Sequence, residues 1–135
     1  MAHVTREPIA AERLVAAVGD VGRGGTALFL GTVRRGAEDG AVVRIEYEAY
    51  PEMLEEEFGR ILAEARERTP GIAVVGVHRI GAVPAGEASI GVAAGAAHRA
   101  EAFAACQWVV EEAKLRLPVW KREILDDGST SWREG

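Results

Sequence analysis

The chain has 135 residues, of which 48% are hydrophobic, and its formal net charge is −5 at pH 7. This length is typical of one domain with a buried core, so we expect a single domain over residues 1–135. The acidic balance argues against broad nucleic-acid binding, and no apolar run approaches the ~20 residues of a membrane span. The N-terminus lacks a signal-peptide pattern and the chain has one cysteine, so we expect a cytoplasmic protein.

The N-terminal part predicts an arm and a helix before the first long strand. Residues 1–7 are expected to form a short strand or arm, and residues 8–18 a helix with proline in its first turn. Residues 22–25 are rich in glycine, but they lack the lysine and the spacing of a P-loop. We therefore interpret them as a turn rather than a phosphate-binding loop.

Two predicted strands flank a glycine-rich connection. The apolar run 26–33 indicates a strand buried on both faces, and it leads directly to Arg34. Residues 36–40 predict a turn, and residues 42–49 alternate polar and apolar side chains as a half-exposed strand does. A mobile loop beside a positively charged strand end can close over a ligand, although most such loops are simply surface loops.

The middle of the chain predicts a second helix and two further strands. The helix begins at Pro51, carries glutamates in its early turns and ends before residues 69–71. We interpret the glutamates as a solvated face rather than a metal site. Residues 72–80 and 88–96 predict strands, and the second is so rich in glycine and alanine that a helix or another backbone can pack closely on it.

The last helix is predicted from residue 98 to the turn before Pro118, followed by an extended segment at 119–124. Its apolar residues recur at steps of three and four, which places them on one buried stripe. The stripe comprises Phe103, Cys106, Val110, Ala113 and Leu117, and Ala102 and Val109 widen it. Cys106 is accordingly interpreted as a small core residue rather than a reactive thiol.

Lys114 interrupts this pattern. At 100° per residue it falls about 20° from Phe103 and about 40° from Val110, at the margin of the apolar stripe. Such a lysine either extends its ammonium group to water or is partly desolvated. Both interpretations stay open on helical geometry alone.

A local concentration of positive charge surrounds Lys114 in this acidic chain. Between residues 113 and 122 the sequence carries Lys114, Arg116, Lys121 and Arg122 without an acidic residue. His98 and Arg99 stand at the other end of the same helix, where free backbone N–H groups favour an anion. The pattern predicts a binding site for an anionic ligand, and we hypothesise that Arg34, His98 and Arg99 converge on one pocket.

Strands interspersed with two long helices and a short N-terminal helix indicate an α+β fold with a mixed or antiparallel sheet. The histidines and Cys106 show no ligand spacing, so we expect no metal and no cofactor. His78 is compatible with either a core or an exposed position, and we assign it no role. The small residues of 88–96 and the three tryptophans lead us to expect that a second copy covers part of the surface.

Five segments follow one another in a distinctive order, at 29–34, 45–53, 77–81, 97–103 and 114–123. In this order they resemble the catalytic (large) subunit of molybdopterin synthase, and the resemblance runs from about Val4 to Trp132. It implies an α/β-hammerhead fold and a homodimer that carries a small ubiquitin-like sulfur-carrier protein at each end, a heterotetramer. The carrier's C-terminal Gly-Gly is a thiocarboxylate, which donates sulfur to cyclic pyranopterin monophosphate to build the dithiolene of molybdopterin.

By matching positions, the resemblance implies that Lys114 and Lys121 are catalytic and that Arg34, His98 and Arg99 bind the substrate. Two departures from the family pattern stand out. Arg35 occupies a position where the family commonly has asparagine, and Arg133 is the last basic residue where the family often continues to an arginine-bearing tail.

The residues alone leave two other classes of function open. One is a non-catalytic, homo-oligomeric module that binds a phosphorylated metabolite, because helix N-termini with arginine bind phosphate in many non-enzymes. The other is a scaffold that only docks the sulfur carrier, which would need no His98–Arg99 pair. Loss of Lys114 distinguishes catalysis from binding, because only a catalyst would keep its affinity and lose turnover.

Overall fold

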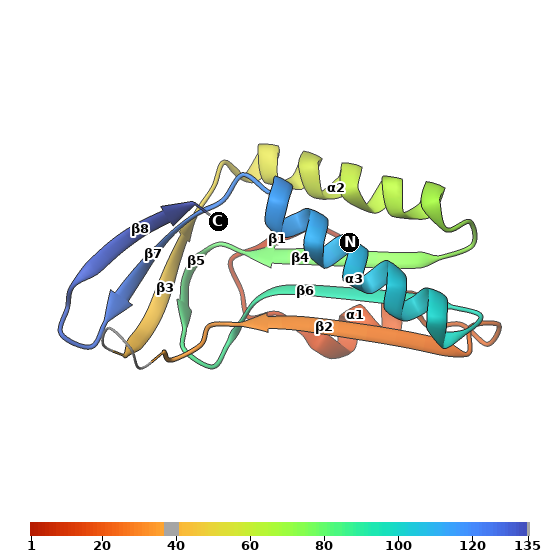
Figure 1. The fold of residues 1–135 in the computed structure, drawn as a ribbon, viewed down its shortest axis with the longest axis horizontal. Coiled ribbons are helices and arrows are strands. Elements are labelled where there is room, and N and C mark those ends of the chain that lie inside the picture. The colour runs from red at the N-terminus through yellow and green to blue at the C-terminus, as the bar shows by residue number, and fades with distance from the viewer. Residues whose placement is uncertain (37–40, 135) are drawn as a thin grey trace.

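The computed structural model describes residues 1–36 and 41–134, which form three helices and eight strands (Figure 1). Residues 37–40 of the predicted turn lie outside the described residues. The helices are α1 (Ala11–Val18), α2 (Pro51–Arg68) and α3 (Arg99–Arg116). The strands are β1 (Val4–Thr5), β2 (Gly25–Thr32), β3 (Val42–Glu48), β4 (Ala73–Arg79), β5 (Gly81–Pro84), β6 (Ala88–Ala96), β7 (Trp120–Leu125) and β8 (Thr130–Glu134).

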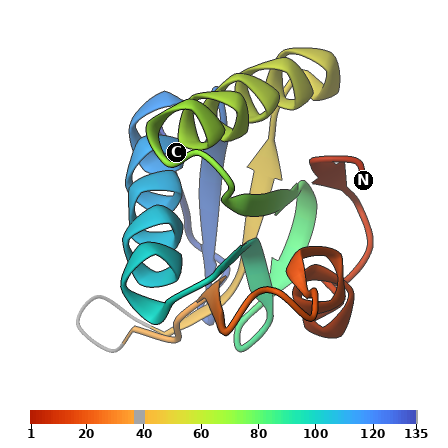
Figure 2. The ribbon, with the colours of Figure 1, turned by 90° about the vertical axis from the view of Figure 1, so that its right-hand side faces the viewer.

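The strands form two four-stranded sheets in the described part of the chain. The first has the order β1-β4-β6-β2 and is mixed, because β1 runs parallel to β4 while the other pairs are antiparallel. The second has the order β5-β3-β7-β8 and is antiparallel. In Figure 1 the second sheet stands across one end of the first, and Figure 2 shows α2 and α3 on one side of the first sheet and α1 on the other. This confirms the predicted α+β fold.

The main core lies between the first sheet and helices α2 and α3. Phe58, Ile61 and Leu62 of α2 pack with Val92 of β6 and Val109 of α3, and all five are fully buried. Contact between α2 and the sheet is close, because a Cβ added to Gly76 would lie 2.3 Å from the Phe58 ring. A second cluster, which includes Val33, Leu54 and Val83, joins the two sheets.

The small residues of β6 serve packing within the chain. This strand is central in its sheet, and a Cβ added to Gly95 would lie 2.3 Å from the carbonyl oxygen of Val18 in α1. A Cβ on Gly91 would lie 2.6 Å from Leu14 of the same helix. The prediction that these residues allow a helix to pack closely is confirmed. The expectation that a second copy covers part of the surface stays a prediction.

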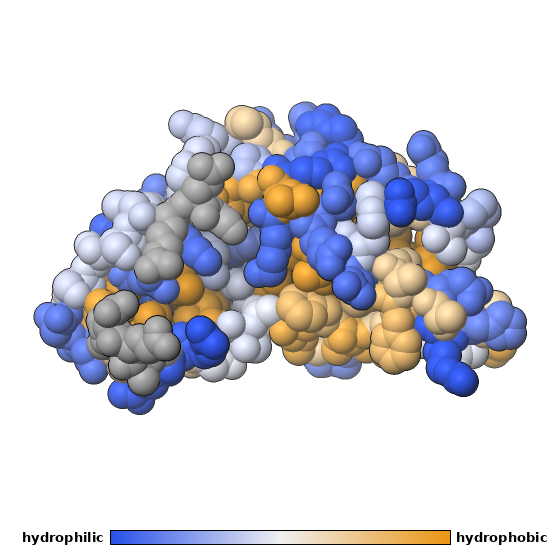
Figure 3. Space-filling model, in the orientation of Figure 1, coloured by the Kyte–Doolittle hydropathy of each residue, from blue (hydrophilic) through white to orange (hydrophobic). Residues whose placement is uncertain are grey.

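Two predictions of burial are wrong. Strand β2 is an edge strand rather than a strand buried on both faces, and Leu28, Phe29 and Leu30 are each 37–40% exposed. Phe103 is 65% exposed, although the rest of the predicted stripe within α3 is buried: Ala102, Cys106, Val109, Val110 and Ala113. Figure 3 shows the resulting apolar surface over β2 and the adjoining part of α3.

Candidate active site

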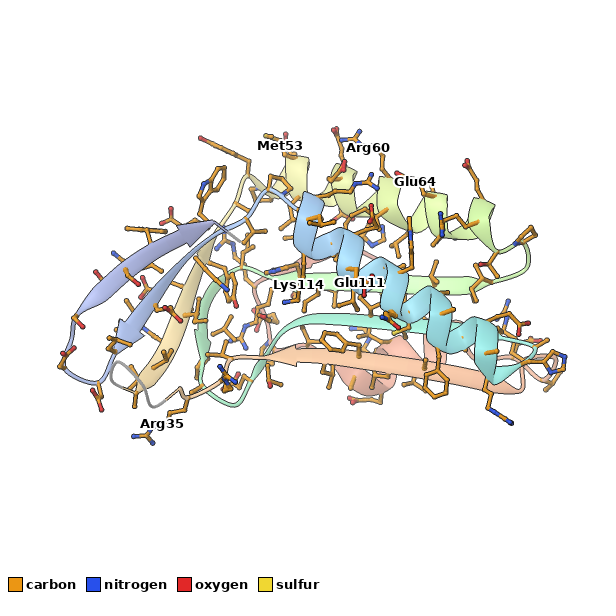
Figure 4. The ribbon with its side chains drawn as sticks, in the orientation of Figure 1. Arg35, Met53, Arg60, Glu64, Glu111 and Lys114 are labelled. Atoms are coloured by element: carbon orange, nitrogen blue, oxygen red, sulfur yellow. The ribbon has the colours of Figure 1, made fainter. Side chains whose placement is uncertain are left out.

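Lys114 and Lys121 line one small pocket where α3 meets both sheets. Its volume is about 50 Å³, and it is bounded by Tyr47, His78, Ser89, Ile90, Ala113, Lys114, Leu117, Val119 and Lys121. We call these nine residues the lysine pocket. Figure 4 shows Lys114 extending from the C-terminal half of α3 toward the sheet beneath it.

The chain returns Lys121 to Lys114 by ending α3 at a proline. The N–H of Leu117 donates to the carbonyl of Ala113, and Pro118 then separates the helix from β7. Proline cannot continue the helical hydrogen bonding, so the chain leaves in an extended conformation. Strand β7 pairs Lys121 with Tyr47 of β3, which places Lys121 at the pocket.

Two of the four basic residues in the predicted cluster are engaged elsewhere. Arg116 bridges the two long helices, with nitrogen–oxygen distances of 3.2 Å to Glu57, 2.6 Å to Glu64 and 3.3 Å to Glu112. These carboxylates raise the pKa of Arg116, with the hydrogen bond to Glu64 as the largest cause. This network anchors the end of α3 that carries Lys114.

Arg122 points to the other sheet surface. It hydrogen-bonds to Glu46 of β3, and its guanidinium carbon lies 5.1 Å from the centroid of the Trp132 ring. The hydrogen bond from Arg122 is the main cause of a lowered pKa of Glu46, and Arg44 adds to it. Of the four basic residues that are close in sequence, the two arginines form ion pairs outside the pocket, and only Lys114 and Lys121 line it.

Lys114 is exposed and Lys121 is half-buried. The exposed position of Lys114 agrees with a side chain that reaches water, one of the two interpretations left open by the helical pattern. Among the residues that the structure describes, neither lysine forms a hydrogen bond or an ion pair with a carboxylate. Both ammonium groups are therefore available to a ligand.

The pocket also contains a buried imidazole that sequence reasoning did not assign. His78 is 7% exposed, and burial lowers its pKa to about 4; the positive charges of Lys114 and Lys121 act in the same direction. Its Nδ1 lies 2.7 Å from the carbonyl oxygen of Arg79. The available signal was a polar residue inside the apolar run 72–80, which indicates burial but not which pocket the ring faces.

Tyr47 and Ser89 are the other polar residues of the pocket that were missed. Burial raises the pKa of the Tyr47 phenol, and a hydrogen bond with Ser89 opposes this effect. Ser89 also lies 3.3 Å, Oγ to carbonyl oxygen, from Gly31 of β2. Nothing in the alternation of these strands distinguishes a pocket residue from an ordinary core residue.

The three predicted substrate-binding residues do not converge within one chain. Strands β2 and β6 pair Gly25 with Ala96 at one end and Thr32 with Ala88 at the other. Arg34 follows Thr32, whereas His98 and Arg99 follow Ala96, so they lie at opposite ends of an eight-residue strand. The hypothesis of a single pocket is wrong for one chain, because antiparallel pairing separates the end of β2 from the end of β6.

Each of these residues nevertheless lies where an anion could approach. Arg34, Arg35, His98 and Arg99 are exposed, and Arg35 points away from the body of the molecule in Figure 4. His98 is the N-cap of α3 and makes no side-chain cap hydrogen bond. The N–H groups of the first turn of α3 therefore keep the partial positive charge that favours an anion.

A wider groove adjoins the lysine pocket at Tyr47, which lines both. Its volume is about 640 Å³, and its walls include Arg6, Tyr50, Ile80 and Trp120. Tyr50 is 67% exposed and Trp120 is 43% exposed. The charged residues Arg6, Glu46 and Glu48 also line it. An open groove with exposed aromatic side chains suits an extended peptide better than a compact ligand.

Over residues 1–36 and 41–134, no group of three or more His, Cys, Asp or Glu side chains is placed to hold a metal ion. No described helix combines the length and the apolar composition needed to cross a bilayer. The thiol of Cys106 is buried, donates to the carbonyl of Val92 at 3.7 Å and has a pKa raised by burial. Its interpretation as a core residue is confirmed.

Comparison with known proteins gives a consistent result. The family model described as MoaE protein matches residues 4–116. The molybdopterin synthase catalytic subunit of Oryza sativa subsp. indica is 45% identical over 122 residues, which is 90% of this chain. The chain spans 63% of the length of that rice protein.

Solved structures agree with the sequence comparison. The crystal structure of molybdopterin synthase from Staphylococcus aureus superposes with a TM-score of 0.93 at 30% identity, covering 99% of this chain and 97% of that one. A protein–protein complex of subunits 1 and 2 of the molybdopterin-converting factor from Helicobacter pylori contains a chain with a TM-score of 0.77. The alignment covers 96% of this chain and 87% of that one at 20% identity, which shows a shared fold.

Proposed function

Because the chain belongs to the MoaE protein family, we propose that it is the catalytic subunit of a molybdopterin synthase, a sulfurtransferase. In this reaction sulfur passes from the C-terminal thiocarboxylate of a small ubiquitin-like carrier to cyclic pyranopterin monophosphate, and two rounds build the dithiolene. The observation that carries the proposal is the lysine pocket, which brings together Lys114 and Lys121 from separate elements.

The chemistry of the pocket suits this reaction. A thiocarboxylate and a cyclic phosphate are both anions, and two unpaired ammonium groups attract them. Opening the substrate and hydrolysing an acyl link to the carrier both need proton transfers, which a positioned lysine can perform. We assign Lys114 the main catalytic role and Lys121 the role of binding and orienting the carrier's tail and the substrate.

The carrier's tail is proposed to enter through the groove beside Tyr47. The pocket volume of about 50 Å³ is too small for a pterin but accommodates the end of a glycine chain. The preceding residues would lie in an extended conformation along the adjoining groove of about 640 Å³. The complex described for the Helicobacter pylori protein supports a partner of this kind.

The substrate-binding residues are proposed to meet across a homodimer. Strand β2 is an edge strand with exposed apolar side chains, which is a liability unless another chain covers it. Two copies of the same edge that pair about a two-fold axis must run antiparallel. The Thr32 end of one β2 then lies beside the Gly25 end of its partner, so Arg34 approaches the partner's Arg99 and His98.

This arrangement puts the anion-binding groups near the lysines. The lysine pocket contains Ser89 and Ile90, and Ile90 pairs with Gly31 near the Thr32 end of β2. Arg34 therefore extends from the same end of the strand, and the partner would supply the helix N-terminus that begins at Arg99. With one carrier on each subunit, the assembly is a heterotetramer. A cytoplasmic location and the absence of a bound cofactor stay predictions.

Reconstitution tests the proposed function. The purified chain is mixed with a carrier bearing a C-terminal thiocarboxylate and with cyclic pyranopterin monophosphate, and the dithiolene product is measured. We expect multiple product molecules per subunit when the carrier is supplied in excess, and none with a carrier that ends in an ordinary carboxylate. If the thiocarboxylated carrier also yields no product, the proposal is wrong, and tight precursor binding would then favour a non-catalytic module.

A further inference from the structure

The lysine pocket contains one ionisable group to which the proposed reaction assigns no role. His78 lies on β4, with its ring edge-on to the ring of Tyr47 at a centroid distance of 5.2 Å and an interplanar angle of 72°. It lines the pocket together with Lys114 and Lys121. A histidine this buried is usually a core residue. Whether His78 can also interact with a group in the pocket depends on which ring nitrogen faces the pocket.

Backbone contacts fix the tautomer and the orientation of the ring. The Nδ1 atom lies 2.7 Å from the carbonyl oxygen of Arg79, which can only accept a hydrogen bond. Nδ1 therefore carries the hydrogen, and in the neutral ring Nε2 keeps its lone pair. The backbone at this position is also held in place. The N–H of His78 donates to the carbonyl oxygen of His3 at 2.8 Å, and the side chain of the next residue, Arg79, forms an ion pair with Glu87 at 2.8 Å.

The lone pair of Nε2 is left for the pocket. Among residues 1–36 and 41–134, no hydrogen bond to Nε2 is formed. Lys114 and Lys121 line the same pocket, and their ammonium groups are hydrogen-bond donors. Lys114 exerts a stronger electrostatic effect on the ring than Lys121 does. A volume of about 50 Å³ also leaves room for a water molecule between the ring and an ammonium group.

We propose that His78 is a positioning residue of the active site, whose Nε2 accepts a hydrogen bond from the Lys114 ammonium group, directly or through one water molecule. This inference rests on the proposed function, because it assigns a task within the same pocket. A lysine has a long and flexible side chain, and a fixed acceptor restricts it to the orientation that faces the substrate. A neutral imidazole serves this purpose without neutralising the charge of the lysine.

Two substitutions of His78 distinguish the contribution of Nδ1 from that of Nε2. The amide of asparagine can replace the Nδ1 donor, so His78→Asn keeps the bond to Arg79 and removes the acceptor at Nε2. The longer His78→Gln places an amide oxygen near the position of Nε2. We expect kcat for dithiolene formation to fall about tenfold or more in His78→Asn, the worth of one hydrogen bond to a charged group. The KM for the carrier should not change, and His78→Gln should recover most of the lost kcat.

His3→Asn is a matched control. His3 makes a similar contact, Nδ1 to the carbonyl of Gly76 at 3.1 Å, but it does not line the lysine pocket. Its substitution should leave kcat unchanged. If His78→Asn turns over like the wild type, or if His78→Gln is as impaired as His78→Asn, the positioning role is wrong. Wild-type protein that forms no product overturns the proposed function instead.

A measurement that needs no turnover tests the hydrogen bond itself. The ¹⁵N chemical shift of His78 Nε2 reports whether its lone pair accepts a hydrogen bond, and it can be read in the protein alone. We expect a shift at Nε2 in Lys114→Met, with Nδ1 unchanged, and a smaller effect in Lys121→Met. An Nε2 signal that is the same in Lys114→Met and wild type would overturn the inference, whatever the reconstitution shows.

Discussion

The buried imidazole of His78 links the stability of the fold to pH. In the folded chain its pKa is lowered to about 4 by burial, while an unfolded histidine titrates near ~6.5. The unfolded chain therefore binds more protons between these values, and stability falls as the pH falls through this window. The full effect amounts to about 3 kcal/mol, because one pKa unit corresponds to about 1.4 kcal/mol.

Urea unfolding at several pH values between 7 and 4 measures this linkage. We expect the free energy of unfolding of wild type to decline more steeply below pH 6.5 than that of His78→Gln, which has no group to protonate at this position. Carboxylates elsewhere titrate in both proteins, so the difference between the two curves isolates His78. Parallel curves would mean that the folded chain protonates His78 as easily as the unfolded chain does.

Arg99 is expected to bind the phosphorylated precursor. A charge-assisted hydrogen bond contributes ~1.5–3 kcal/mol, so Arg99→Ala should weaken precursor binding by more than about tenfold. Calorimetric titration of wild type and variant with the precursor measures the change, and Arg13→Ala, on α1, is a control of equal charge change. An unchanged affinity in Arg99→Ala would remove this residue from the binding site.

Sequence and structure agree unevenly at the level of single residues. Lys114 was singled out because it interrupts an apolar stripe, and Lys121 because it belongs to the local concentration of positive charge and matches a catalytic position of the family. Both line the pocket. His78 and Tyr47 come from strands whose alternation only separates buried from exposed side chains. Their place in the pocket depends on how two sheets meet, which no local pattern encodes.

At the level of elements, the contact between α2 and β4 depends on Gly76 of β4, whereas Gly59 of α2 has room for a side chain. A Cβ on Gly76 would lie 2.3 Å from the Phe58 ring, whereas a Cβ on Gly59 in α2 would lie 3.9 Å from the nearest atoms, in the His3 ring. Gly76→Ala should therefore destabilise the protein by about 1–3 kcal/mol through overpacking. Gly59→Ala should stabilise it by up to about 1 kcal/mol, because alanine favours the helix.

Thermal or chemical denaturation of the two variants checks this pair. Both replace one glycine by alanine, so the variants share the same chemical change and differ in their surroundings. A Gly76→Ala protein as stable as wild type would show that Phe58 moves aside at little cost, which would contradict the close packing of α2 on the sheet.

The periodicity of the sequence predicted all three helices and most of the strands. It missed β5 and β8, which are short or follow a tight turn. Gly81 has a φ of +93°, so the chain bends between β4 and β5 and moves from one sheet to the other. The apolar run of β2 was read as a strand buried on both faces, because the sequence does not reveal whether a strand is covered by its own chain or by another.

For the whole molecule, we expect a homodimer formed through β2. Analytical ultracentrifugation should give a dimer at micromolar concentration for the wild type. Leu28→Glu should give a monomer, because the substitution places a charge in the apolar surface on each side of the two-fold axis. Leu115, which is 81% exposed on α3, offers a control: Leu115→Glu should remain dimeric. A monomeric wild type would exclude this assembly.

The dimer also predicts complementation between two inactive variants. Arg34→Ala and Arg99→Ala should each lose most dithiolene formation. In a mixed dimer, one of the two sites combines the intact Arg34 of one subunit with the partner's intact Arg99. Mixing the two proteins after dissociation should restore up to about one quarter of wild-type activity, because half of the dimers are mixed and each has one complete site. No recovery would show that both arginines act within one subunit.

The most direct test of the account concerns Lys114, and it compares turnover with carrier binding in Lys114→Ala and Lys114→Arg. If Lys114 is the main catalytic group, both variants lose dithiolene formation while their affinity for the carrier stays close to that of wild type. The arginine variant is the stricter of the two, because it keeps the positive charge but its guanidinium group does not give up a proton. Turnover of Lys114→Arg near the wild-type rate would contradict the account, since a fixed positive charge would then be sufficient at this position.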